Sequence, residues 1–111
     1  MDDSDFKLLH RCPLFQSTPE RDLRPHLERV PYGFTNHEAD KVIRSQGDRY
    51  DELLILLRGA VAGEFRTYDG RSMRVETLYP PDTLASAFLF SPQGRLPVDI
   101  VAIKPVRLFR I

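Results

Sequence analysis

The residues in this chain that could hold a metal ion are few and scattered. The sequence of 111 residues contains three histidines, His10, His26 and His37. The only acidic residues near one of them at a ligand-like spacing are Glu38 and Asp40, beside His37. A structural zinc site normally takes four ligands, usually including thiolates. We therefore predict that the histidines are surface residues and not ligands of a structural zinc ion, while the metal content stays open.

Two side chains are candidates for a nucleophile. The single cysteine, Cys12, excludes an internal disulfide and is typical of a reducing compartment. It precedes a proline, and we expect it to be buried as a small apolar residue. Ser86 lacks the Gly-x-Ser-x-Gly elbow of hydrolases and has no histidine close in sequence. We predict that the protein is not an enzyme.

The charged residues show no basic excess. Sixteen Lys and Arg balance sixteen Asp and Glu, so the net charge is zero and an intrinsic affinity for nucleic acid is not expected. The densest group of arginines surrounds one expected turn and is interleaved with carboxylates, which predicts a solvated strand face: Arg58, Arg66, Arg71 and Arg74 with Glu64, Asp69 and Glu76.

An apolar segment near the C-terminus is the strongest candidate for a binding site. No charged residue lies between Asp82 and Arg95. Such a lining suits an apolar or planar ligand, although the same residues would also serve as the ordinary core of a small β domain. We predict an effector pocket formed by this segment and the neighbouring hairpin: Met73, Val75, Leu84, Ala85, Ser86, Ala87, Phe88, Leu89, Leu96, Pro97 and Val98.

Turn signals recur along the chain and predict the architecture that positions this pocket. They fall every 11 or 12 residues, with apolar-rich runs between them: Gly47-Asp48, Arg58-Gly59, Asp69-Gly70, Pro81-Asp82 and Gln93-Gly94. Short antiparallel strands joined by tight turns produce this spacing. The fold class is therefore predicted to be mainly β, a sandwich or barrel.

The individual elements follow from periodicity and capping. A first helix is expected from an N-cap at Asp3 or Ser4 to Arg11, and a second from an N-cap at Thr18, with Pro19 as its first residue, to about residue 30. The intervening Leu14 and Phe15 are expected to enter the core. Strands are expected at 32–35, 41–44, 53–57, 61–68, 73–79, 98–103 and 106–111, with a polar turn at 36–40. The run at 53–57 is expected to be buried on both faces.

Length and composition indicate one domain in the cytoplasm. The acidic start, Met1-Asp2-Asp3-Ser4-Asp5, does not resemble a secretory signal, and no apolar run reaches the roughly 18 residues of a membrane span. The chain stops within a strand pattern, so we expect it to be an excised part of a longer protein.

Several segments resemble the sensor domain of the Crp/Fnr superfamily of bacterial transcription regulators. The lead-in LLHRCPLF at 8–15, VIRSQGD at 42–48, LLILLRGAV at 53–61 and PDTL at 81–84 are similar to motifs of that family. The resemblance implies a double-stranded β-helix, also called a jelly-roll or β-roll, at 31–111 after a helical lead-in at 1–30. It also implies a dimerisation helix and a helix-turn-helix DNA-binding domain beyond Ile111.

The same resemblance also implies that this chain does not bind cyclic AMP or cyclic GMP. Cyclic-nucleotide binders hold the phosphate with a Gly-Glu pair and an Arg-Ser or Arg-Thr pair. Here Ala85-Ser86 and Leu96-Pro97 occupy those places, and Arg95 lies one position too early. An anionic phosphate in a dry pocket needs a cationic partner such as Arg.

Other members of the superfamily suggest what the pocket holds instead. Iron–sulfur sensors need a cysteine cluster, which is missing here. Haem-based sensors of nitric oxide or carbon monoxide, and regulators of hybrid-cluster-protein genes (the HcpR-like subgroup), have no such need. Haem wants apolar walls and an axial His, Met or Cys, and Met73 is the one candidate ligand near the segment. The resemblance thus implies a cytoplasmic regulator of redox or nitrosative-stress genes. The regulator would be a homodimer that contacts DNA and RNA polymerase but no membrane.

Two other interpretations stay open. The domain is either a ligand-free scaffold for dimerisation and protein contacts, or a small metabolite-binding β-sandwich enzyme similar to a cupin. Cupin metal sites need a His-x-His pair, which the sequence does not contain.

Overall fold

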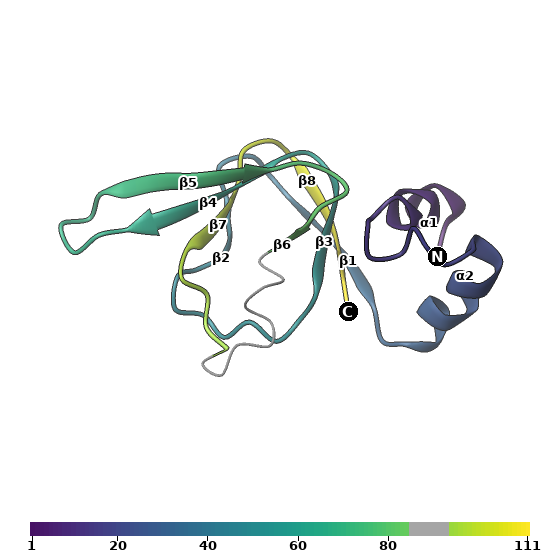
Figure 1. The fold of residues 1–111 in the computed structure, drawn as a ribbon. Coiled ribbons are helices and arrows are strands. Elements are labelled where there is room, and N and C mark those ends of the chain that lie inside the picture. The colour runs from purple at the N-terminus through teal and green to yellow at the C-terminus, as the bar shows by residue number, and fades with distance from the viewer. Residues whose placement is uncertain (85–93) are drawn as a thin grey trace.

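Two four-stranded antiparallel sheets pack against each other, and two short helices cover one of them (Figure 1). The computed structural model describes residues 1–84 and 94–111. One sheet has the strand order β1-β8-β3-β6 and the other β2-β7-β4-β5. This mainly β architecture with short N-terminal helices confirms the predicted β-roll. The elements are α1 (Asp3–His10), α2 (Glu20–Arg29), β1 (Gly33–His37), β2 (Val42–Arg44), β3 (Leu54–Arg58), β4 (Val61–Arg66), β5 (Ser72–Leu78), β6 (Thr83–Leu84), β7 (Asp99–Ala102) and β8 (Val106–Arg110).

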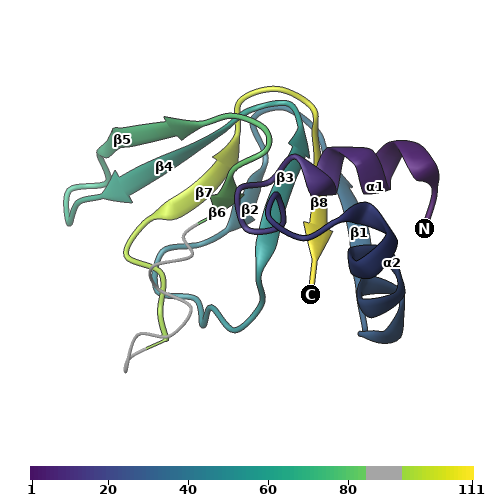
Figure 2. The ribbon, with the colours of Figure 1, turned by 45° about the vertical axis from the view of Figure 1, so that its right-hand side comes forward.

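Strand β3 is buried on both faces, as its continuous apolar run predicts. Leu54 and Leu56 point into the space between the two sheets, whereas Ile55 and Leu57 face the helices. The alternation of side chains along a strand sends neighbours to opposite faces. Each face therefore has a core of its own: an inner cluster within the roll and an outer cluster under α1 and α2. Figure 2 shows the helices lying along the sheet that contains β1, β8 and β3.

The predicted turns lie where the structure bends back on itself. Four of the turn glycines have positive φ values: Gly47, Gly59, Gly70 and Gly94. At Gly59 an added Cβ would lie 2.2 Å from the carbonyl oxygen of Pro105. The β3–β4 turn therefore packs directly on the backbone of the β7–β8 turn, which only glycine permits.

The β4–β5 hairpin extends beyond the rest of the roll (Figure 1). Its charged residues pair on the surface: Arg74 lies 3.2 Å from Glu64, and Arg71 lies 3.3 Å from Asp69. This confirms the prediction that the arginines here belong to a solvated strand face. A β-bulge interrupts the pairing of the two strands next to Gly63.

Both helix starts differ from the sequence prediction. The N-cap of α1 is Asp2, whose carboxylate accepts hydrogen bonds from the backbone N–H groups of Ser4 and Asp5. The prediction of Thr18 as the N-cap of α2 is wrong, because the helix begins at Glu20 without a side-chain cap. The carbonyl of Thr18 instead accepts a hydrogen bond from His10 Nε2 at 2.7 Å.

Three further expectations need correction. Asn36 and His37, predicted to lie in a turn, extend β1, because β8 offers pairing partners as far as Val106. Strand β6, which was not predicted, adds a two-residue edge to β3. Leu14 is 54% exposed instead of entering the core, although Phe15 packs on the outer cluster.

Neither helix in the described part of the chain is long and apolar enough to cross a membrane.

Candidate effector site

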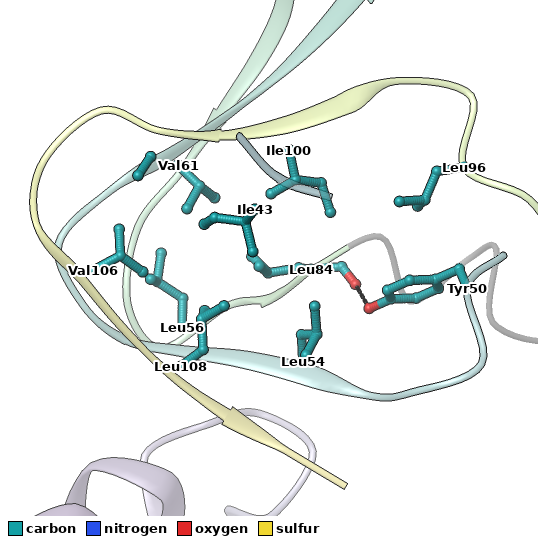
Figure 3. Packing of buried hydrophobic residues seen from close by; sticks show 11 residues of the cluster. Ile43, Tyr50, Leu54, Leu56, Val61, Leu84, Leu96, Ile100, Val106 and Leu108 are labelled. Atoms are coloured by element: carbon teal, nitrogen blue, oxygen red, sulfur yellow. Dashed lines mark hydrogen bonds between the residues drawn. The ribbon is translucent and has the colours of Figure 1, made fainter. Parts of the chain in front are cut away.

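The inner cluster brings together two of the predicted pocket residues. Leu84 comes from β6 and Leu96 from the segment before β7, and both side chains are buried within the roll beside Tyr50 and Leu54 (Figure 3). The predicted residues Ala85, Ser86, Ala87, Phe88 and Leu89 lie outside the described residues.

Leu96 is held in place by its backbone as well as by its side chain. Its N–H donates to the carbonyl of Asp48 at 2.9 Å, and its carbonyl accepts from the N–H of Gly47 at 2.8 Å. The side chain is only 2% exposed. The position at which the resemblance expects a phosphate-binding arginine therefore carries a leucine that points into the core.

Arg95 points away from this core. Its side chain is exposed, and its Nη1 donates to the carbonyl of Gly47 at 2.9 Å. Within residues 1–84 and 94–111, the buried charged side chains are Asp5 and Asp99, both acidic. Each of these carboxylates is paired with an arginine, Asp5 with Arg107 and Asp99 with Arg66. Within the same two ranges, the buried residues include no Lys or Arg that would pair with a phosphate.

The hairpin residues of the predicted pocket, Met73 and Val75, lie on β5, the edge strand of its sheet. A Cβ added to Gly63 would lie 3.6 Å from Cγ2 of Val75 and 3.5 Å from Cγ2 of Val98. Met73 pairs with Phe65 farther along the hairpin. Met73 is 57% exposed and Val75 54% exposed, and Pro97 is exposed as well. These apolar side chains are therefore accessible, whereas Leu84 and Leu96 are enclosed.

Tyr50 is a site residue that sequence reasoning missed. Its hydroxyl donates a hydrogen bond to the carbonyl of Leu84 (Figure 3), and its backbone N–H donates to the carbonyl of Gly94 at 2.6 Å. Burial raises the pKa of Tyr50 to about 12, so the hydroxyl stays a donor at neutral pH. The only local signal was its place three residues after Gly47, in the turn that supports Leu96.

A polar cluster around Asp99 was also missed. One carboxylate oxygen of Asp99 accepts from the N–H of Gln46 at 2.6 Å, and the other lies 3.0 Å from Nε of Arg66. The side-chain carbonyl of Gln46 accepts from the N–H of Arg66 at 2.9 Å. This cluster ties the end of β4 and the start of β7 to the turn that precedes Tyr50.

The histidines and the cysteine lie elsewhere. His10 and His26 are on the helices and His37 is on β1, where burial, followed by the nearby Arg44, lowers its pKa. His26 is exposed as predicted, while His10 and His37 are half-buried. Cys12 is buried, as predicted, and burial raises its pKa. The described residues contain no group of three or more His, Cys, Asp or Glu side chains that would hold a metal ion.

The β4–β5 hairpin carries two kinds of group that a haem site uses, apolar side chains and a thioether. The exposed side chains of Phe65 and Val75 and the half-buried Val98 are apolar, as the faces of the macrocycle require. The thioether of Met73 is accessible on the same hairpin, and Met is an accepted axial ligand. The β4–β5 hairpin therefore offers apolar side chains and one thioether sulfur, the kinds of group that a bound haem contacts.

Comparisons with known proteins agree with this fold. Residues 34–111 match the family model of the cyclic nucleotide-binding domain. The sensor domain of the transcriptional regulator DNR from Pseudomonas aeruginosa superposes with a TM-score of 0.80 at 23% identity, covering 94% of this chain and 68% of that one. The N-terminal domain of a transcriptional regulator from Streptomyces coelicolor A3(2) gives a TM-score of 0.76 at 23% identity, covering 94% and 72%.

A protein crystallised with a cyclic nucleotide has the same fold. The regulatory domain of protein kinase A from Toxoplasma gondii, solved with cAMP, gives a TM-score of 0.78 at 20% identity and covers 100% of this chain and 42% of that one. This chain likewise spans 49% and 47% of two other matched chains. No curated protein matches it in sequence. Since the family model covers most of the chain, the protein belongs to the cyclic nucleotide-binding domain family.

Proposed function

We propose that this domain is the effector-sensing part of a Crp/Fnr-type transcription regulator and that its effector is an apolar molecule, not a cyclic nucleotide. The observation that carries the proposal is the burial of Leu96. A neutral side chain, 2% exposed, occupies the place where the family resemblance expects the phosphate-binding cation. Burying a phosphate charge without a partner costs several kcal/mol, on the order of the whole binding energy of a weak ligand.

Haem is the effector that we propose first. Its support is the accessible apolar side chains on the β4–β5 hairpin together with the thioether of Met73. When bound, haem iron offers a coordination position for a diatomic gas such as nitric oxide. The chain's own residues would cover the macrocycle with apolar side chains, and the thioether of Met73 would bind the iron.

The regulator that we propose acts as a homodimer and contacts DNA and RNA polymerase through parts outside this chain. Effector binding would then shift the population between two arrangements of the DNA-reading parts. Such a shift requires that the effector bind one arrangement more tightly than the other. The similarity in fold to the sensor domain from Pseudomonas aeruginosa supports this placement. The signal that we propose is redox or nitrosative stress.

Two titrations test the proposal. Haemin added to the purified chain should give a sharp Soret band that saturates near one equivalent, and calorimetry with cyclic AMP or cyclic GMP should show no binding at millimolar concentration. The matched variant is Met73→Leu, which keeps an apolar side chain but removes the thioether, and it should shift the Soret band and weaken binding.

Each opposite result has a definite meaning. Tight and saturable uptake of cyclic AMP would overturn the exclusion of nucleotides. Failure to bind haemin, together with no thermal shift across a panel of metabolites, would favour the ligand-free scaffold over a sensor.

A further inference from the structure

A groove opens at one end of the sheet that the helices cover, which is not the sheet of the β4–β5 hairpin. It lies where β1 and β3 end and β8 begins, and its volume is about 500 Å³. A groove of this size accommodates a small organic molecule. Its walls include Asn36, His37, Glu38, Arg58, Pro105 and Arg107.

Two arginines lie next to each other in this groove. In the pairing of the strands, Arg58 of β3 and Asn36 of β1 are both opposite Arg107 of β8. Like charges at opposite positions of neighbouring strands destabilise a sheet. A negative group bound beside this pair would relieve the repulsion between the two guanidinium groups.

The two arginines differ in how they are held. The guanidinium of Arg107 donates two hydrogen bonds to the carboxylate of Asp5, lies 3.3 Å from Oδ1 of Asn36 and stacks on the ring of Phe34. Arg58 is exposed, and its side chain has no hydrogen bond or ion pair with any residue that the structure describes. The donors of Arg58 are therefore available to a ligand, whereas Arg107 is fixed by the fold.

The other walls of the groove limit the charge of a ligand. His37 is half-buried, and burial, followed by the nearby Arg44, lowers its pKa, so that its ring is largely neutral at pH 7. The carboxylate of Glu38 is exposed and repels a second negative charge on a ligand. Pro105 is exposed and apolar. The groove thus favours a ligand that has one negative charge on an apolar body.

We propose that this groove binds a small apolar monocarboxylate and that Arg58 is the residue that pairs with its carboxylate. A guanidinium presents two parallel N–H donors, which match the two oxygens of a carboxylate. Pro105 and the methylene stem of Arg58 contact the apolar body. The groove lies on the other sheet from the β4–β5 hairpin, so this proposal does not depend on a haem effector.

Benzoate is the probe for this site, and benzamide is the uncharged control of similar shape. At low ionic strength and pH 8, we expect benzoate to bind with a dissociation constant in the millimolar range, as a ligand of so few atoms does. It should shift the backbone amide resonances of residues 36–38, 58 and 106–107. Benzamide, which has no charge, and inorganic phosphate, which is mainly a dianion at this pH, should each bind at least about tenfold more weakly.

The variant Arg58→Gln removes the charge at an exposed position, and circular dichroism verifies that the fold is kept. It should weaken benzoate binding about tenfold, the loss expected for one hydrogen-bonded charge pair. Arg71→Gln is the matched control, because Arg71 is exposed in the turn of the β4–β5 hairpin. It should leave the affinity for benzoate unchanged. Glu38→Gln should strengthen the binding of phosphate severalfold, since the repulsion is gone.

The outcomes are distinct. Amide shifts that are confined to the groove, lost in Arg58→Gln and kept in Arg71→Gln support the proposal. Three results overturn it: no shifts in the groove at tens of millimolar benzoate, equal binding of benzamide or phosphate, or equal effects of the two arginine variants. Haemin enters none of these measurements, so a failure here leaves the proposed effector untouched, and a failure of haemin to bind leaves this site untouched.

Discussion

The guanidinium of Arg107 on β8 donates two hydrogen bonds to the carboxylate of Asp5 on α1, from Nε at 3.1 Å and from Nη2 at 2.9 Å. Asp5 is 7% exposed. The same guanidinium lies 4.6 Å from the ring centroid of Phe34 and 3.3 Å from Oδ1 of Asn36. This bidentate pair joins the helical lead-in to the sheet that it covers, in a geometry that binds carboxylates strongly.

We expect Asp5→Ala to lower the free energy of unfolding by about 1 to 3 kcal/mol, because it leaves a half-buried guanidinium without its counter-charge. Urea unfolding followed by circular dichroism measures the change. Glu28→Ala is the control, since Glu28 is exposed and pairs with Arg24 on the same helix. Its expected effect is below about 0.5 kcal/mol, and equal effects of the two variants would contradict a special role for the Asp5–Arg107 pair.

Replacing Leu96 by Arg should not restore nucleotide binding. The side chain points into the inner cluster, so Leu96→Arg buries an unpaired cation and should cost about 3 to 5 kcal/mol of stability. The neighbouring Pro97 is exposed, and Pro97→Arg should change stability by less than about 0.5 kcal/mol. Thermal melting compares the two, and a stable Leu96→Arg variant that binds cyclic AMP would refute the view that this position belongs to the core.

The two turn glycines Gly59 and Gly70 should respond differently to the same change. Both have positive φ, but an added Cβ meets a backbone oxygen at 2.2 Å at Gly59 and nothing within 4 Å at Gly70. Gly70→Ala should therefore cost only the conformational strain, about 1 to 2 kcal/mol. Gly59→Ala should cost clearly more, because the β7–β8 turn must move as well. Similar midpoints in a urea titration would disprove the close packing of the two turns.

Tyr50 should make stability depend on pH in the alkaline range. Its pKa is raised to about 12 in the folded protein from 10.0, so the folded state holds the proton more tightly than the unfolded state does. The stabilisation is complete below pH 10 and is lost as the pH rises toward 12, by about 2 to 3 kcal/mol in total. The stability difference between wild type and Tyr50→Phe should shrink by that amount between pH 9 and 12. A constant difference across this range would argue against a buried, protonated Tyr50.

Asp99 should contribute more to the free energy of unfolding than a surface carboxylate does. It is 7% exposed and bonds to both Gln46 and Arg66. Asp99→Ala should cost about 2 to 3 kcal/mol because it leaves the N–H of Gln46 and a guanidinium without their acceptor. Glu64→Ala, which removes the partner of the exposed Arg74, should cost less than about 1 kcal/mol. Chemical unfolding of both variants provides the measurement, and the reverse order would refute the role of the Asp99 cluster.

The sequence alone determined those features of the fold that depend on residues close together in the chain. Turn glycines and the alternation of side chains are local properties, so the spacing from Gly47 to Gly94 and the apolar run of β3 predicted a mainly β sandwich or barrel. The family resemblance then specified the β-roll. The replacement of a cation by Leu96 was likewise visible in the order of residues, and with it the prediction that cyclic nucleotides are excluded.

The tertiary structure decided the contacts between residues that are distant in the chain. The hydroxyl of Tyr50 reaches a carbonyl on β6, Asp99 bonds to Gln46, and Arg107 bonds to an acidic residue on the first helix. Nothing in the local pattern distinguishes these side chains from others of their type. Their partners are set by how the two sheets and the helices pack, because a buried polar group must find a hydrogen bond wherever the fold places it.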